Sequence, residues 1–247
     1  MTIRDILFKF IPPKHRLGAN YFYMKFRGAQ EYELKILDRL VPRGANISID
    51  VGANDGVYSY ALSKLSNKVI AFEPQIECCN FIKSANDSKI TVHQAGLSDA
   101  KGSFELFTPI RGGKKLTGYA SFLKSSEYGL STVVEVNTLD SYGFTGVYFI
   151  KIYVEGHEAS VIRGAFETIK LNRPVILVEI EQRHIGNDSV SSIFNLIEGL
   201  GYQGYFYKNG VLNGLTLFDV SSHQNLKNKK YYINNFIFIP KEKSSAE

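Results

Sequence analysis

The sequence predicts an α/β fold in which a doubly wound, mostly parallel sheet lies between two layers of helices. Three observations support this fold class. Apolar, strand-like runs alternate with amphipathic helical stretches over most of the 247 residues, and 44% of the residues are hydrophobic, enough for one sizeable core. A turn containing Gly52 and Gly56 joins the first strand to a helix. Two late strands without a helix between them indicate an antiparallel edge.

The first half of the chain follows this alternation closely. Residues 31–40 have helical spacing and stop at Pro42, and they end an N-terminal helical segment expected over residues 1–45. Buried strands are expected at 47–51, 68–73 and 90–95, with helices at 57–65 and 75–87. The main domain is expected at 46–240, followed by a disordered tail at 241–247.

A small β insertion interrupts this order at about residues 102–138. Residues 103–108 and 132–137 alternate between apolar and polar side chains, as half-exposed antiparallel strands do. The loop of residues 111–128 between them is Gly- and Lys-rich, and it is either a lid over a ligand or a solvated loop. Afterwards, strands are expected at 147–153, 174–180, 204–207 and 231–239, and helices at 157–170 and 189–200.

Composition and charge limit the possible partners only loosely. The formal net charge of +5 is too mild and scattered for a nucleic-acid surface, and the run Lys227 to Lys230 is expected in a solvated loop. The adjacent Cys78 and Cys79 match no metal-binding spacing, so a reduced, cytoplasmic protein is expected. The oligomeric state cannot be predicted from these features.

The N-terminal stretch Met1 to Pro12 carries Arg4, Asp5 and Lys9 among its apolar residues, which excludes a signal peptide. It is either a first helix packed on the core or a short basic amphipathic helix that touches a membrane surface. Because no apolar run is long enough to cross a bilayer, at most peripheral membrane contact is expected.

The turn from Asp50 to Gly56 is the strongest candidate for a ligand site. Gly52 and Gly56 allow the backbone to turn tightly and to approach a ligand. A dinucleotide site would have a third glycine where this chain has Asn54. Asp50 and Asp55 would repel a pyrophosphate, and they suit a ligand with ammonium and sulfonium groups, such as S-adenosylmethionine.

Two further positions fit an adenosine ligand. Glu73 ends the second strand, where a carboxylate can accept hydrogen bonds from both ribose hydroxyls. Ser98 and Asp99 follow the third strand in a turn that passes the adenine in this fold, and either they bind its edge or they only form a turn.

Several segments together resemble the FkbM family of methyltransferases. The segments are Ile49–Ser59, Ala71–Pro74, Ala95–Gly102, Thr138–Asp140, Ile150–Glu158, Val161–Ala165, Arg173–Ile180 and Asn234–Pro240. The resemblance implies a class I methyltransferase (Rossmann-like) fold with a seven-stranded sheet and an antiparallel edge strand. It implies S-adenosylmethionine as donor, with S-adenosylhomocysteine as product, an oxygen acceptor such as a sugar hydroxyl, and donor-site roles for Tyr58 and Pro74.

The sequence departs from the family pattern at Tyr153, where the resemblance leads us to expect an Asp beside the transferred methyl group. A tyrosine is neutral near pH 7 and is a poor base. Three interpretations are open: a substitution introduced at this position, a natural variant whose chemistry runs through Glu155 or His157, or a side chain that only packs.

The candidates for the acceptor side lie at the carboxyl ends of strands. A general base would help a weakly nucleophilic hydroxyl, and the candidates are Glu155, His157 and Glu179, with Glu181 on the same side of its strand as Glu179. His157 could instead only cap a helix, and the two glutamates could only face solvent. His93, Glu155, Glu158 and Glu179 match no metal signature, so no metal is expected and His93 is interpreted as a hydrogen-bonded core residue.

The sequence therefore favours an O-methyltransferase acting on a sugar or glycan intermediate. A phosphorylated and a lipid-linked acceptor are both left open, and the charge of the 111–128 loop would suit a phosphorylated or nucleotide-linked one. One alternative is an O-methyltransferase of small secondary metabolites. Another, suggested by Tyr153, is a protein that binds S-adenosylmethionine without catalysis. A nicotinamide oxidoreductase is disfavoured by Asp50 and by the missing third glycine.

Overall fold

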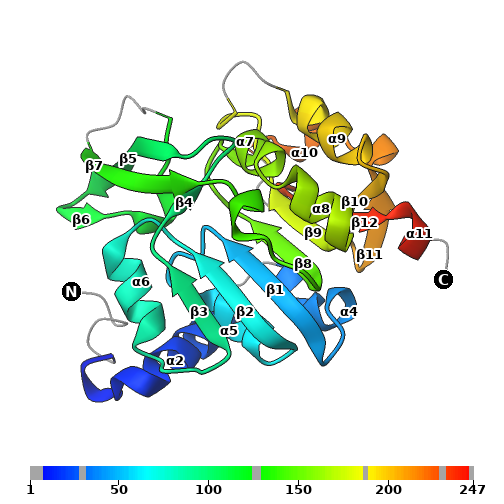
Figure 1. The fold of residues 1–247 in the computed structure, drawn as a ribbon. Coiled ribbons are helices and arrows are strands. Elements are labelled where there is room, and N and C mark those ends of the chain that lie inside the picture. The colour runs from blue at the N-terminus through cyan, green and yellow to red at the C-terminus, as the bar shows by residue number, and fades with distance from the viewer. Residues whose placement is uncertain (1–7, 28–31, 124–128, 186–188, 228–231, 245–247) are drawn as a thin grey trace.

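The structure is a computed structural model that describes residues 8–27, 32–123, 129–185, 189–227 and 232–244. An eight-stranded sheet carries helices on both faces, and a four-stranded sheet lies beyond the carboxyl ends of β1, β2 and β3 (Figure 1). The predicted α/β class, a doubly wound and mostly parallel sheet, is confirmed.

The first part of the chain alternates helices and strands. Its elements are α2 (Pro13–Phe26), α3 (Tyr32–Lys35), α4 (Leu37–Leu40), β1 (Ala45–Val51), α5 (Val57–Ser63), β2 (Ser66–Phe72), α6 (Ile76–Lys83) and β3 (Ile90–His93). The small sheet follows, with β4 (Gly96–Leu97), β5 (Gly102–Arg111), β6 (Lys114–Lys115), the 3-10 turn η1 (Thr117–Tyr119) and β7 (Gly129–Asn137). Its strand order is β4-β7-β5-β6, in the region where a β insertion was expected.

The second part returns to the main sheet. Its elements are η2 (Asp140–Tyr142), β8 (Val147–Ile152), α7 (Glu158–Arg163), α8 (Phe166–Asn172), β9 (Val175–Glu179), α9 (Val190–Glu198), β10 (Tyr202–Lys208), β11 (Val211–Gly214), η3 (Leu215–Leu217), α10 (Val220–His223), β12 (Asn235–Pro240) and α11 (Lys241–Ser244). Helix α9 begins with a capping box, in which the Ser189 side chain accepts a bond from the Ser192 backbone.

The order of the main sheet, β11-β10-β12-β9-β8-β1-β2-β3, places the first strand in the middle. The chain runs outward from β1 to β3, and it then crosses to β8 on the other side of β1. Ligands in such sheets bind beyond the carboxyl ends of the strands at this reversal of direction. The sheet topology thus places the ligand site between the ends of β1 and β8.

The sheet differs from the predicted one in two ways. It has eight strands instead of seven, because β10 and β11 form a hairpin. Since β11 is mostly exposed, it lacks the buried apolar run by which the other strands were found. The antiparallel strand that pairs with β9 is β12, and it lies inside the sheet between β9 and β10 instead of at the edge.

Alternate residues of the strands pack into two hydrophobic cores, one on each face of the main sheet. Ile150 and Ile152 of β8 pack with α7, α8 and α9, whereas Phe149 packs with α4 and α5 on the other face. The same alternation sends Ile49 to the first core and leaves Asp50 facing α5, where Ser59 donates a bond to it. This pleat decides which side chains near the site can reach a ligand.

Two helices predicted as single elements are broken. The helix expected at 31–40 divides at Ile36. The helix expected at 157–170 divides after Arg163, at Gly164, where a Cβ would lie 1.9 Å from the Ser98 carbonyl oxygen. Loop and helix are therefore in contact at Gly164, and the second helix starts on a new axis.

The chain ends differ from the expectation as well. Residues 241–244 form α11 instead of a disordered tail, held by an ion pair of Glu242 with Arg173 at 2.8 Å, and residues 245–247 lie outside the described residues. The interpretation of Met1 to Pro12 falls largely outside them too. Helix α2, which follows, packs on α5 and α6.

Candidate functional site

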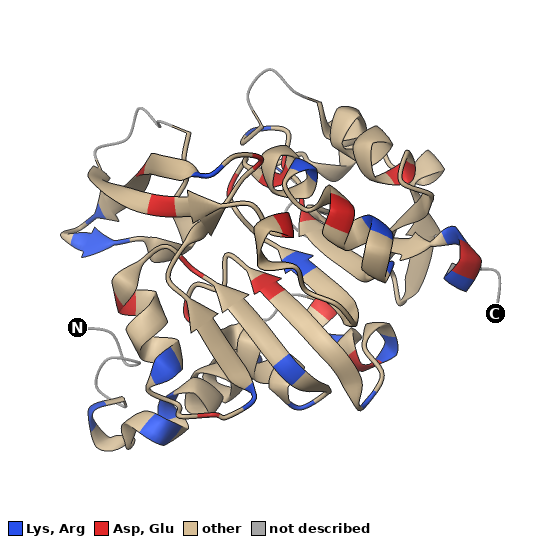
Figure 2. Cartoon of the chain, viewed as in Figure 1, with Lys and Arg blue, Asp and Glu red and all other residues tan. Residues whose placement is uncertain are grey.

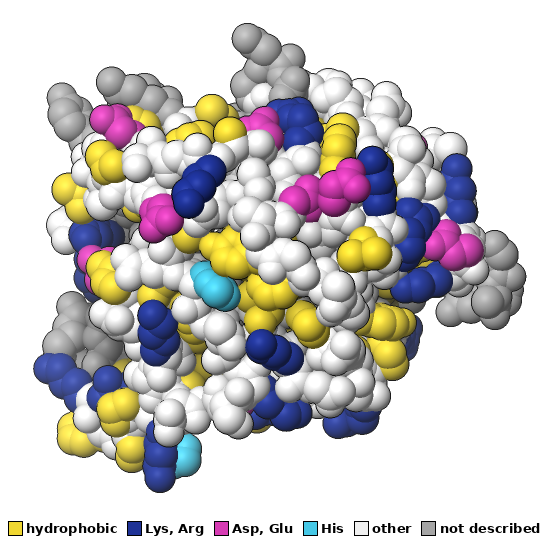
Figure 3. Space-filling model, viewed as in Figure 1, with side chains coloured by type: hydrophobic (Ala, Val, Ile, Leu, Met, Phe, Trp, Pro, Cys, Tyr) yellow, Lys and Arg dark blue, Asp and Glu magenta, His cyan; other side chains and the backbone are white. Residues whose placement is uncertain are grey.

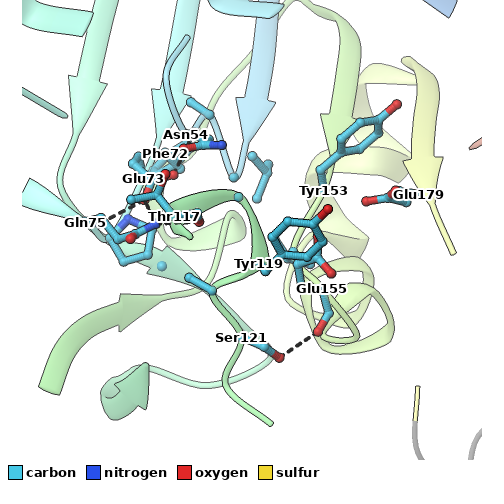
Figure 4. A pocket seen from close by; sticks show the side chains of 18 of the residues that line it. Asn54, Phe72, Glu73, Gln75, Thr117, Tyr119, Ser121, Tyr153, Glu155 and Glu179 are labelled. Atoms are coloured by element: carbon cyan, nitrogen blue, oxygen red, sulfur yellow. Dashed lines mark hydrogen bonds between the residues drawn. The ribbon is translucent and has the colours of Figure 1, made fainter. Parts of the chain in front are cut away.

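A cavity of about 510 Å³ lies at the carboxyl ends of β1, β2, β8 and β9, a size typical of ligand pockets. One group of labelled side chains lining it comprises Asn54, Phe72, Glu73, Gln75 and Thr117, and a second comprises Tyr119, Tyr153, Glu155 and Glu179 (Figure 4). The cavity therefore has a side next to the β1 turn and a side next to the ends of β8 and β9.

The turn after β1 approaches the end of β8 very closely. Gly52 has a φ of +69°, and a Cβ there would lie 1.8 Å from the Tyr153 carbonyl oxygen, so only glycine fits. Asn54 is also left-handed, with φ +46°. Gly56 does not line the cavity, because its Cα faces Leu17 of α2 at a distance that leaves no room for a side chain.

Glu73 lies at the cavity wall with a side chain that is almost fully buried. Its Oε2 accepts a bond from the Asn54 backbone N–H at 2.7 Å, and its Oε1 accepts bonds from the backbone and side chain of Gln75. Burial raises the pKa of this carboxyl, although the bonds from Gln75 and Asn54 oppose the effect. A carboxylate has about four acceptor sites, so one remains for a ligand hydroxyl.

Asp50, which was predicted to bind the donor, does not line the cavity. Its carboxylate is fully buried on the α5 side, 3.0 Å from Lys151 Nζ. Lys151 also donates to the carbonyl oxygens of Val51 and Gly52 at 3.2 and 2.7 Å, whereas its contact with Asp50 Oδ1 is an ion pair without hydrogen-bond geometry. The charge of Asp50 is therefore compensated inside the protein, and it cannot select between ligands directly.

Asp55, Tyr58 and Pro74 line the cavity, as does Tyr153. Tyr58 and Tyr153 pack edge to face with ring centroids 5.4 Å apart, and their hydroxyls are 3.1 Å apart. Lys151 Nζ lies 4.4 Å above the Tyr153 ring. These contacts favour the interpretation in which Tyr153 packs into the wall.

Ser98, Asp99 and His157 lie together outside the cavity lining, and their roles at the adenine and in catalysis stay predictions. Ser98 Oγ and His157 Nε2 are 2.8 Å apart, and Asp99 pairs with Arg163 at 3.2 Å. Burial lowers the pKa of His157. The turn after β3 still reaches the cavity, but through Ala95, Gly96 and Leu97.

Glu155 lines the cavity and forms a pair with a histidine that the sequence did not point out. Its Oε2 lies 3.0 Å from His184 Nδ1, and both side chains are largely buried. The bond to Glu155 raises the pKa of His184. Glu155 is also left-handed, with φ +50°, and its carbonyl accepts a bond from Ser121 Oγ at 2.6 Å.

Glu179 and Glu181 lie on one side of the strand, as their spacing predicts. Both accept hydrogen bonds from Asn234 Nδ2, and all three residues line the cavity. Glu181 also pairs with Arg183 and accepts a bond from Tyr232. Although burial acts against it, these bonds lower the pKa of Glu181. This end of the cavity is therefore polar and carries both signs of charge.

Residues 117–122 of the small sheet cover the cavity. The Thr117 carbonyl accepts a bond from Gln75 Nε2 at 3.0 Å, and Ser121 Oγ bonds to Glu155. All six residues from Thr117 to Phe122 line the cavity. Residues 117–122 of the 111–128 loop are thus a cover attached at both sides of the cavity, whereas residues 124–128 lie outside the described residues.

His93 and the two cysteines pack among other side chains and do not line the cavity. His93 stacks on Phe72 with ring centroids 5.0 Å apart, and it is half-buried beside Tyr142 instead of hydrogen-bonded in the core. Cys78 and Cys79 are buried free thiols whose pKa is raised by burial to about 12 and about 11. In the described ranges, no group of three His, Cys, Asp or Glu could hold a metal ion, and no helix is long and apolar enough to span a membrane.

Sequence reasoning missed Lys151, His184 and Arg183 at the site. A signal existed for Lys151, because a charged residue within the apolar run of β8 needs a partner. His184 and Arg183 lie in an irregular segment after β9, where no periodicity indicates the direction of a side chain. Only the tertiary fold brings Arg183 to the cavity and His184 to Glu155.

Comparison with solved structures agrees with this fold. A methyltransferase FkbM from Methylobacillus flagellatus KT is 15% identical with a TM-score of 0.53, covering 83% of this chain and 47% of that chain. A precorrin-6y C5,15-methyltransferase from Geobacter metallireducens GS-15 is 13% identical with a TM-score of 0.48, covering 85% and 87%. This chain therefore spans about half the length of the first protein.

Comparison with known sequences identifies the family. No curated protein matches the chain. The model of the methyltransferase FkbM domain matches residues 50–204, which is more than half of the chain and includes the β1 turn, Glu73 and Glu155. The chain belongs to the FkbM family of methyltransferases.

Proposed function

We propose that the protein is an S-adenosylmethionine-dependent O-methyltransferase that methylates a hydroxyl of a sugar or glycan intermediate. The observation that carries this proposal is one cavity lined by Glu73 on one side and by Glu155 on the other, with His184 bonded to Glu155 from behind the cavity lining. The first group suits a nucleoside donor. The second suits a polar acceptor that loses a proton.

The residues on the β1 side fit the donor. Glu73 keeps an acceptor site for a ribose hydroxyl, and Phe72, Leu97 and Leu106 offer apolar surface to an adenine ring. Asp55 lies in the turn, where its carboxylate suits an ammonium group. When bound, S-adenosylmethionine supplies a methyl group on an already activated sulfonium.

The protein must then position the acceptor and take its proton. Glu155 is the carboxylate that lines the cavity next to Tyr153, and His184 is bonded to its Oε2. We assign Glu155 as the group that accepts the hydroxyl proton, with neutral His184 as the group that shares it. Glu179, Glu181, Arg183 and Asn234 provide donors and acceptors for the other hydroxyls of a carbohydrate.

This assignment predicts a pH dependence. His184 must be neutral to receive the proton, and its pKa is raised above the ordinary value of 6.5. The rate constant kcat should therefore rise with pH through a pKa above 6.5. Glu155→Gln should lower kcat by about 10² or more while leaving donor affinity unchanged, and His184→Asn should remove the rise.

The control is Glu105→Gln, an exposed carboxylate on β5 outside the cavity. Release of S-adenosylhomocysteine would be measured with a panel of sugars, sugar phosphates and nucleotide sugars. Donor binding would be measured by calorimetry with S-adenosylmethionine and with NAD. Turnover of phenolic metabolites alone would contradict the acceptor class, donor binding without any turnover would indicate a non-catalytic protein, and tight binding of NAD alone would reject the donor.

A further inference from the structure

Helix α2 and the residues just before it concentrate the positive charge of the protein. Residues 8–27 contain Lys9, Lys14, Arg16, Lys25 and Arg27 and no Asp or Glu. The whole chain has 29 Lys and Arg against 24 Asp and Glu. The rest of the chain therefore has 24 of each sign, and the net charge of +5 is carried by this one segment. Figure 2 shows α2 with Lys and Arg alone.

The same segment exposes large aromatic side chains. Phe10, Phe22 and Phe26 are 83%, 58% and 93% exposed. In Figure 3, hydrophobic and cationic side chains alternate over the position of α2 at the lower left. Singly exposed residues are ordinary, whereas a cluster among like charges indicates a binding surface.

Helix α2 is anchored to the core by buried side chains, so its exposed side chains point to solvent on the opposite face. Leu17 and Asn20 are buried, and Asn20 Nδ2 donates to the Asp55 carbonyl. Phe26 lies nine residues after Leu17, which places it on the opposite side of a helix with 3.6 residues per turn. The cationic surface continues onto α5, where Lys64 Nζ lies 4.4 Å above the Tyr60 ring, itself in contact with Phe22.

We propose that the outer face of α2, comprising Lys14, Phe22, Lys25 and Phe26, docks on an anionic phospholipid surface. A surface that presents basic residues next to exposed Phe side chains can bind a membrane surface through attraction to anionic headgroups and burial of apolar area. Helix α2 carries no carboxylate and the neighbouring Asp87 is paired with Lys64 at 3.8 Å, so this face is complementary to anionic lipid, and its exposed phenylalanines add apolar contact. Met24 of the same helix lines the cavity. A lipid-linked acceptor would then be presented beside the site, a consequence that rests on the proposed function.

The experiment is co-sedimentation of the full chain with vesicles, and it needs no methyl donor or acceptor. Vesicles of phosphatidylcholine with phosphatidylglycerol should bind the protein, and added salt should weaken binding. Vesicles of phosphatidylcholine alone should bind it poorly. Because each charge near the surface changes partitioning by about fivefold, the double variant Lys14→Glu/Lys25→Glu should bind at least about tenfold more weakly.

Two further variants complete the test. Phe22→Ser/Phe26→Ser should weaken binding while preserving thermal unfolding, and Phe26→Ser alone serves if the double variant fails to fold. The control Lys101→Glu/Leu171→Ser changes one exposed cation and one exposed apolar residue elsewhere and should bind as the unaltered chain does. Equal binding to both kinds of vesicle, or equal loss in the control, would overturn the proposal. So would a dimer, seen without vesicles, that Phe22→Ser/Phe26→Ser dissociates.

Discussion

Two carboxylates close to each other at the end of β8 have very different surroundings. Glu155 has His184 as its partner. Glu158, at the start of α7, is 1% exposed, and its Oε1 accepts a bond from the Gly156 N–H at 3.1 Å. Its Oε2 has no hydrogen-bond partner within the described part of the chain. Burial raises the pKa of Glu158 to about 7, and the nearby charge of Glu155 adds to this effect.

Glu158→Gln should make the protein more stable at high pH. Because the folded-state pKa of Glu158 exceeds the unfolded value of 4.5, folding favours the protonated form, and stability falls as pH rises from about 4.5 to about 7. The variant loses this dependence. Its unfolding free energy should exceed that of the unaltered chain by roughly 2–3 kcal/mol at pH 8, with little difference near pH 4.

Urea unfolding at both pH values provides the measurement, and the exposed Glu105→Gln is the matched control. A difference between Glu158→Gln and the unaltered chain that stays constant with pH would mean that Glu158 is ionised in the folded protein across this range.

At the scale of elements, hydrogen bonds from Lys151 and Tyr153 link the end of β8 to the end of β1, and the sequence pattern does not predict them. Lys151 on β8 bonds to the carbonyls of Val51 and Gly52, and Tyr153 N–H donates to the Val51 carbonyl at 3.1 Å. Gly52 makes this approach possible. The turn that forms one wall of the cavity therefore depends on the strand that forms the opposite wall.

Gly52→Ala should be severely destabilising. A Cβ at Gly52 would lie 1.8 Å from the Tyr153 carbonyl oxygen, so the two strand ends must separate. Gly112→Ala is the matched control, because Gly112 also has a positive φ, +57°, but nothing within 4 Å of the added Cβ. We expect a loss of more than about 3 kcal/mol for Gly52→Ala and about 1 kcal/mol for Gly112→Ala. Similar losses in urea unfolding would show that backbone strain alone matters at Gly52.

At the scale of the whole molecule, the cavity is assembled from segments far apart in the chain. Met24 of α2, Glu73 after β2, Thr117 of the small sheet, Glu155 after β8 and Asn234 before β12 all line it. A ligand that contacts so many elements binds the folded state alone. Its binding must therefore stabilise the entire fold.

S-adenosylmethionine should raise the unfolding free energy by about 2.7 kcal/mol at a concentration of 100 times its Kd. For a chain of 247 residues, this corresponds to a rise in Tm of roughly 5–10 °C. Thermal unfolding with increasing donor concentration measures it. NAD should have no such effect, and Glu73→Ala should weaken the response to S-adenosylmethionine; an undiminished response in Glu73→Ala would remove Glu73 from the donor site.

Much of the fold could be predicted because it depends on local pattern. The five parallel strands were placed to within one or two residues of their observed ends, since each is a buried apolar run between turn residues. The eighth strand, β11, is exposed and gave no such signal. The break at Gly164 was not predicted, and the close approach of the Ser98 carbonyl to Gly164 comes from a loop about sixty residues earlier, which no local pattern indicates.

By itself, the sequence determined the α/β class, the position of the β1 turn, the placement of Glu73 at the end of β2 and the membership of the FkbM family. These follow from the order of motifs and from periodicity, which are properties of the chain. The tertiary structure alone decided which polar groups face the cavity. The pleat turns Asp50 to Lys151, the loop after β3 turns Ser98 to His157, and the segment after β9 brings His184 to Glu155. The direction of a side chain and the identity of its partner depend on residues distant in sequence, so a local sequence pattern cannot predict either.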